Sequence, residues 1–376
     1  FDTKKVKNMS NMFNSCENLK SLSLTNFNVE NVTDMEYLFA NCKSLETLNI
    51  SNFKTPKLEK MKYMFYNCNS LKNLELNGIN TDLVTDMSSV FEGCFNLSSL
   101  DVSQFHTSRV TNMSRMFRRC ISLKNLSLNN FNTSSVLAMD YMFSTCSNLD
   151  NLIFNEFDTS KVTDMKYMFY NCLQLKSLDV SFFRTENVQN MNYMFSHCKF
   201  LENLNVSKFN TSNVINMAYM FNYCNSLKTI DVTNFDTSNV TNMEGMFSKC
   251  SKLEELDISN FNTQKVKKMG YLFAFCGSLK SLDLSSFKTS SVKNMTLMFQ
   301  GCISIQSLDI SVFNTLKVID MAHMFDSCVE LTNIQTDIDK FNTSKVVNMN
   351  GMFRNCAKIN SIDISYFDIR NVQNIS

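Results

Sequence analysis

Cysteine recurs along the chain at an almost constant interval. Of the thirteen intervals between its 14 cysteines, twelve are 26 residues long and the last, from Cys328 to Cys356, is 28 residues long. Phenylalanine, methionine and leucine follow the same period. A period this regular indicates tandem copies of one short unit. Because such a unit cannot bury its own apolar face, neighbouring copies must stack to form a core.

Each copy follows one consensus, F-[ND]-T-S-x-[VL]-x-x-M-x-x-M-F-x-x-C-x-x-L-x-x-L-x-[LIV]-S-x. Fourteen full copies occupy residues 1–366, and residues 367–376 begin a fifteenth. Two extra residues lie within 335–340. The chain contains 7 glycines and 1 proline, which leaves no candidate linker. We therefore expect one solenoid rather than several domains.

Two patterns within the unit predict its local structure. The L-x-x-L-x-L run, as in Leu19, Leu22 and Leu24, is typical of a leucine-rich repeat and predicts a short strand. The 3-3-1-3 spacing of apolar residues from Val110 to Cys120 predicts a short helix or 3₁₀ turn. The sequence therefore predicts an α/β repeat solenoid of the leucine-rich-repeat type. Its parallel β-sheet would form one face and its short helical or 3₁₀ segments the other.

Charge and motif content argue against several classes of function. The 36 basic and 35 acidic residues form no basic stripe, so we expect no nucleic acid partner. No apolar run is long enough to span a bilayer. His106, His197 and His323 occupy different positions of the repeat, and no Gly-rich phosphate loop occurs. We expect no catalytic site, no cofactor and no enzyme activity.

The regular cysteines suggest either a metal site or a row of core thiols. No C-x-x-C pair occurs, which argues against zinc. Side chains stacked in parallel also point the same way, which argues against disulfides. We favour buried free thiols, a common state of unpaired cysteine, and predict no metal site.

One position of the predicted strand points outward on the presumed concave face and carries an acidic row, which is a candidate binding stripe. Its members are Asp179, Asp231, Asp257, Asp283 and Asp309. One interpretation is a site for a cation or a basic partner, since carboxylate oxygens are calcium ligands. The other, which we favour, is a solvated row hydrogen-bonded to the Ser and Thr residues two positions later. Calcium needs six to eight oxygens, and this row has no loop to collect them.

A second column carries tyrosine in four consecutive copies, just before the Met-Phe pair on the predicted convex side. Its members are Tyr141, Tyr167, Tyr193 and Tyr219. These rings suit half-buried packing between copies. They also suit a contact strip, because tyrosine is enriched at protein interfaces.

The unit is specific enough to resemble a known family. The run from Val240 to Phe261 is similar to BspA-like leucine-rich repeats, and more narrowly to the 26-residue form of mycoplasma surface lipoproteins. Related repeats occur in anaerobic protists and giant viruses. The resemblance covers essentially the whole chain, with departures such as Ile79 for Phe and Val90 for Met. It implies surface exposure and a role in adhesion or host interaction, and it carries over no catalytic residue.

Three functional hypotheses follow. The first is a non-enzymatic, surface-displayed solenoid that mediates cell or host contact by binding a protein or cell-surface ligand. The second is a structural protein that self-associates into a fibre, filament or virion surface, which predicts assembly at micromolar concentration. The third is an intracellular protein scaffold. We expect the cell surface or extracellular space as its location, with the virion surface or cytoplasm as alternatives.

Overall fold

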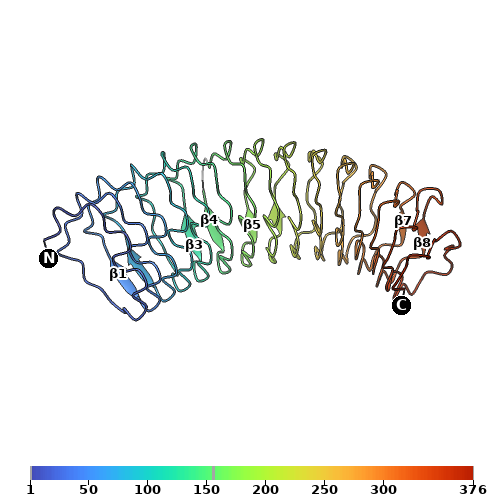
Figure 1. Ribbon diagram of the computed structural model, residues 1–376, viewed down its shortest axis with the longest axis horizontal. Helices are drawn as coiled ribbons and strands as arrows, with labels where there is room; N and C mark the ends of the chain where they lie inside the picture. Colours follow the sequence, from blue (N-terminus) through green and yellow to red (C-terminus); the bar gives the residue numbers. More distant parts are fainter. Residues whose placement is uncertain (1, 155–156, 376) are drawn as a thin grey trace. The chain divides into compact units, whose positions relative to one another are not determined.

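The computed structural model describes residues 2–154 and 157–375. The chain divides into two compact units, each built from successive coils that follow the copies of the repeat (Figure 1). Unit 1 comprises residues 1–176 and 182–187, and unit 2 comprises residues 177–181 and 188–376.

Short parallel strands pair equivalent residues of neighbouring copies within each unit. Thr47 lies beside Asn73 and Leu48 beside Leu74, 26 residues apart. In unit 1 the pairs are β1 (Thr47–Asn49) with β2 (Asn73–Glu75) and β3 (Asn125–Ser127) with β4 (Asn151–Ile153). In unit 2 they are β5 (Ser177–Leu178) with β6 (Asn203–Leu204) and β7 (Ser307–Asp309) with β8 (Asn333–Gln335). This repeated parallel pairing confirms the predicted solenoid class.

The strands alternate between core and solvent as their sequence predicts. In β1 the central Leu48 is buried, whereas Thr47 and Asn49 point outward. The surface formed by these outward side chains and by the equivalent residues of other copies is called the strand face below. Most of its side chains are polar, with the exposed Ile153 of β4 as an exception, because the period of two directs these positions to solvent.

The prediction of a short helical or 3₁₀ segment is wrong, although the solenoid class to which it belonged is right. No helix occurs among the described residues, and consecutive turns cover the stretch between the first Met and the Cys of each copy. The N–H groups of Met35, Tyr37 and Phe39 donate to carbonyls of the next copy at 2.9–3.1 Å. Those of Leu38 and Ala40 close turns within their own copy. Alternate donors thus leave the copy, which is incompatible with helical i→i−4 bonding.

This turn segment needs left-handed backbone at two positions of the unit. Tyr37 and Asn41 have φ of 56° and 58°, and the equivalent residues of the other copies follow them. Positive φ at the third position of a turn is the requirement of a type II turn and favours Gly or Asn. Tyr, Arg and Leu also occupy these positions, so the inter-copy hydrogen bonds outweigh the local conformational cost. The outward side chains of this segment are called the turn face below.

Columns of identical side chains fill the core. The rings of Phe39 and Phe65 stack with centroids 5.7 Å apart, and this contact repeats from copy to copy. Twelve of the 14 cysteines are buried free thiols, as expected. The Cys94 Sγ donates to the Phe65 carbonyl at 3.3 Å. Burial raises the pKa of the Cys94 thiol to about 12, so it remains protonated at neutral pH.

A buried threonine also joins most pairs of neighbouring copies. The Thr55 Oγ1 accepts the Asn80 N–H at 2.8 Å and donates to the Asn80 carbonyl at 3.2 Å. The same position is a buried Thr in most copies, for example Thr81 and Thr107. One hydroxyl thus satisfies both a donor and an acceptor of the next copy's backbone.

Candidate functional site

The strand face of unit 2 contains a shallow, polar groove with a volume of 570 Å³. Two members of the predicted acidic row, Asp179 and Asp231, lie in its lining, with Asn205 at the equivalent position between them. The rest of the lining is made of Ser, Thr and Asn side chains, the Glu202 carboxylate and three apolar residues, Leu178, Leu204 and Ile230. All five predicted aspartates lie within unit 2 and are exposed.

Each carboxylate of the row caps the turn that follows its strand. The Ser181 N–H donates to Asp179 Oδ1 at 2.9 Å. Both the N–H and the hydroxyl of Thr233 donate to Asp231 Oδ1, at 3.1 and 2.6 Å. Asp257, Asp283 and Asp309 accept the N–H of the residue two positions later in the same way. The predicted bonds to Ser and Thr are therefore present and hold each carboxylate in one orientation.

These hydrogen bonds keep the row ionised. Donation from the Ser259 hydroxyl and N–H lowers the pKa of Asp257 below its ordinary value of 3.8. The hydroxyl and N–H of Ser285 likewise donate to Asp283 and lower its pKa, although the nearby Asp257 charge acts in the opposite direction. Within the described ranges, none of the five aspartates has a Lys, Arg or His partner within 4.0 Å. The row is therefore a line of fixed, uncompensated negative charges.

The described residues include no group of three or more His, Cys, Asp or Glu side chains that could hold a metal ion. The aspartates of the row come from different coils, and each already uses Oδ1 to cap its own turn. The row is therefore suited to recognise positive charge along a surface rather than to enclose one ion.

The four predicted tyrosines lie on the turn face, half-buried, with φ between 57° and 58°. Tyr141 stacks on Tyr167 in unit 1 at 4.6 Å between centroids. Tyr193 stacks on Tyr219 in unit 2 at 4.8 Å. The column stops at Gly245, where a Cβ would lie 2.2 Å from the Tyr219 ring. The rings thus pack along the array while exposing one edge.

The three histidines do not form a common site. His106 Nδ1 lies 2.9 Å from Asp82 Oδ1 in unit 1. In unit 2, His197 stacks on Tyr223, and His323 contacts the buried Asp326. Burial and the Lys249 charge lower the pKa of His197. Each imidazole therefore has its own local partner in a different copy.

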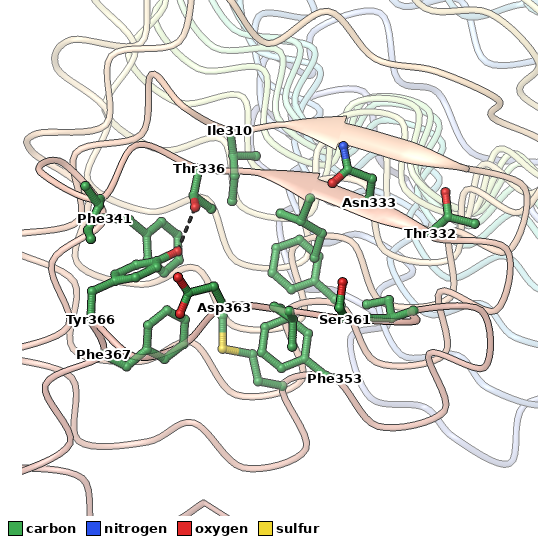
Figure 2. Close-up of a pocket in the computed structure, with 16 residues that line it drawn as sticks. Ile310, Thr332, Asn333, Thr336, Phe341, Phe353, Ser361, Asp363, Tyr366 and Phe367 are labelled. Atoms are coloured by element: carbon green, nitrogen blue, oxygen red, sulfur yellow. Dashed lines mark hydrogen bonds between the residues drawn. The ribbon is translucent and has the colours of Figure 1, made fainter.

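A partly open pocket of 410 Å³ lies in unit 2 beside the two-residue insertion (Figure 2). Ile310, Phe341 and Phe353 are among its apolar lining residues. Figure 2 shows Tyr366 and Thr336 on one side, joined by a hydrogen bond of 2.6 Å between their hydroxyls. Asp363 is the only ionisable carboxylate in the lining, and its Oδ1 caps the Ser365 N–H.

A group of arginines in unit 1, three of them on the turn face, was not predicted from the sequence. Four of the seven arginines in the chain lie within eleven residues, at Arg109, Arg115, Arg118 and Arg119. Arg118 Nη1 lies 2.9 Å from the buried Glu92 carboxylate of the preceding copy. The sequence signal for this group was the occurrence of four of the seven arginines in a single copy.

A search for helices long and apolar enough to cross a membrane finds none in residues 2–154 and 157–375.

Comparison with solved structures supports the fold assignment. A leucine-rich repeat protein from Bacteroides ovatus has 19% sequence identity and a TM-score of 0.50, with 86% of this chain and 79% of that chain covered. A leucine rich cell surface protein from Faecalibacterium prausnitzii has 18% identity and a TM-score of 0.48, with 88% and 83% covered. The likeness to the Bacteroides ovatus protein shows a leucine-rich-repeat fold and, at 19% identity, nothing further.

No curated protein matches the sequence significantly. One family model, described as "Mycoplasma protein of unknown function, DUF285", matches six overlapping segments. They are residues 1–100, 85–205, 150–229, 172–282, 224–332 and 304–376. This agrees with the predicted resemblance to the mycoplasma form of the BspA-like repeats. Since the matches together span the whole sequence, the chain belongs to this family of Mycoplasma-type repeat proteins.

Proposed function

We propose that this chain is a non-enzymatic protein-interaction solenoid, displayed at the cell surface, that mediates adhesion through its strand face. The observation that carries the proposal is the row of five fixed, ionised carboxylates, Asp179, Asp231, Asp257, Asp283 and Asp309. Leucine-rich-repeat neighbours and the mycoplasma-type family support a protein-interaction role.

The chemistry of the strand face defines the kind of partner. The row carries negative charge, and the groove beside it is lined by small polar residues, Glu202 and three aliphatic residues. A partner segment with Lys or Arg side chains would complement this surface. Because the charges are exposed, their contribution is electrostatic steering and orientation, and binding should weaken as salt rises.

Matched variants test this proposal. Asp257→Asn with Asp283→Asn removes two charges from the row but keeps an oxygen for each cap. Asn205 shows that Asn serves there, since its Oδ1 accepts the Ser207 N–H at 3.1 Å. The control, Asp236→Asn with Glu244→Gln, makes the same change in charge at positions of unit 2 outside the row.

Beads coated with each protein would be counted on cultured cells at low and physiological salt. We expect adhesion of the wild type, a several-fold loss for the row variant and little change for the control. Equal adhesion of all three proteins would show that the row is not the contact surface. No adhesion by the wild type would contradict the adhesion role itself.

A further inference from the structure

One copy of the repeat in unit 1 combines several positive charges with no carboxylate. Residues 105–130 carry five cationic side chains and no carboxylate. The preceding copy, residues 79–104, has four carboxylates and no Lys or Arg. The following copy, residues 131–156, has three carboxylates and also no Lys or Arg. Three of the five cations, Arg115, Arg118 and Arg119, come from the turn segment of this copy, whereas Arg109 and Lys124 lie outside it.

Aromatic rings support these three guanidinium groups. The Cζ atoms of Arg115 and Arg118 lie 5.3 and 5.2 Å from the centroid of the Tyr141 ring. The Cζ of Arg119 lies 4.8 Å from the centroid of the Phe95 ring. Stacking of this kind restricts the flexible arginine side chains, so less entropy is lost when they bind a ligand.

Only one of the three charges is compensated. Arg118 pairs with Glu92, which is almost completely buried. Arg115 and Arg119 have no carboxylate within 4.0 Å among the described residues. The Nε atoms of Arg115 and Arg118 are buried without a hydrogen-bond partner in the same part of the chain. The charges of Arg115 and Arg119 therefore remain uncompensated beside half-buried aromatic rings.

We propose that Arg115, Arg118 and Arg119, with Tyr141 and Phe95, form a docking site for an acidic segment of a protein partner, whose carboxylates pair with Arg115 and Arg119. The planar guanidinium fork matches a carboxylate with two parallel hydrogen bonds. Arginine and tyrosine are also enriched among the interface residues that contribute most of the binding energy in protein complexes. This surface is separate from the acidic row, so the two proposals stand independently.

The limited extent of the positive charge favours a short acidic segment over a long polyanion. Neighbouring copies are about 5 Å apart along the array. A sulfated glycan or a nucleic acid strand would extend beyond the cationic copy and meet the carboxylates of both neighbours. A segment with two or three Glu or Asp side chains places its charges within one copy.

Variants taken from the array itself test the proposal without disturbing the backbone. Arg115→Ser with Arg119→Asn introduces residues that other copies carry at the same positions with positive φ, namely Ser89 at 55° and Asn67 at 56°. The matched control is Arg109→Ser with Lys124→Ser, for which Ser135 and Ser98 are the equivalents. Arg118 is retained because its removal would leave the Glu92 carboxylate unpaired.

The probe is a fluorescent peptide with three consecutive glutamates, and its binding is followed by fluorescence polarisation at low salt. We expect binding to the wild type and the control and a loss of about tenfold or more in the arginine variant. Unchanged binding in that variant, or no binding to the wild type, would overturn the proposal. Preference for heparin or for a phosphoserine peptide over the glutamate peptide would also overturn the assignment to a carboxylate partner. Arginine-dependent dimerisation in sedimentation velocity would instead identify a second copy of the chain as the occupant.

Discussion

Two buried carboxylates form ion pairs between neighbouring copies at a position where other copies carry different residues. Glu92 and Asp326 occupy the same position of the unit, and each is paired with an arginine of the following copy, Arg118 or Arg354. Burial acts to raise the pKa of Asp326, but hydrogen bonds from Arg354, Ser327 and Gln300 and the Arg354 charge outweigh it, so the pKa is lowered. The Asp326–Arg354 pair therefore stays charged inside the array.

Removing one partner of such a pair should cost more than removing both. Arg118→Ala leaves the buried Glu92 unpaired, and we expect a loss of roughly 2–4 kcal/mol in the free energy of unfolding. The double variant Glu92→Ala with Arg118→Ala should be more stable than Arg118→Ala alone, since Ala40 and Ala274 occupy this position in other copies. Urea denaturation measures both. A double variant that is no more stable than the single one would contradict this account.

The sequence predicted the apolar columns but not these ion pairs. The repeated Phe, Met and Cys positions tolerate little variation, so their period reveals their burial. Glu92 and Arg118 lie at a position that varies among Ala, Tyr, Ser and Asn. A variable position normally indicates a solvated surface, and only the backbone path shows that this one faces the neighbouring copy.

At the scale of elements, the turn segment is where prediction failed. The 3-3-1-3 spacing of Val, Met, Met, Phe and Cys suits one helical face, but it also suits a chain of turns whose alternate N–H groups donate to the next copy. Local propensity argued against left-handed backbone at Tyr141 and Arg115. The donors directed to the next copy, such as the Arg115 N–H to the Asp140 carbonyl at 2.9 Å, are long-range contacts that a single unit does not reveal.

The capped strand ends predict a defined acid response. Hydrogen bonds from Ser or Thr lower the pKa of Asp231, Asp257, Asp283 and Asp309 relative to the ordinary value of 3.8. Groups with a lowered folded-state pKa add stability above their unfolded pKa and lose it as the pH falls through the folded value. These carboxylates should therefore leave the melting temperature nearly constant from pH 7 to about pH 5. Their protonation should lower the melting temperature below about pH 4.

Circular dichroism melts across this range test the acid response. The Asp257→Asn and Asp283→Asn variant should lose less stability on acidification than the wild type, because its amides do not titrate. Identical acid profiles for the two proteins would show that these caps do not contribute to the pH dependence.

At the scale of the whole molecule, the period of the sequence predicted the leucine-rich-repeat class and the positions of the strands. It also predicted the acidic row and the tyrosine column as surface features. The arginine cluster was not predicted because the composition of the whole chain does not show that four of its seven arginines fall in one copy. A surface of this kind depends on which side chains of adjacent copies meet, and that follows from the register of the turns.

The central claim is that the strand face of unit 2 contacts the partner, and site-specific photo-crosslinking on cultured cells tests it most directly. A photoreactive amino acid would replace Asp257 in one protein and, as a control outside the row, Asp236 in another. The account predicts crosslinked cell-surface protein from position 257 and little or none from position 236. Crosslinks from position 236 alone, or none from position 257 in a protein that still adheres, would contradict it.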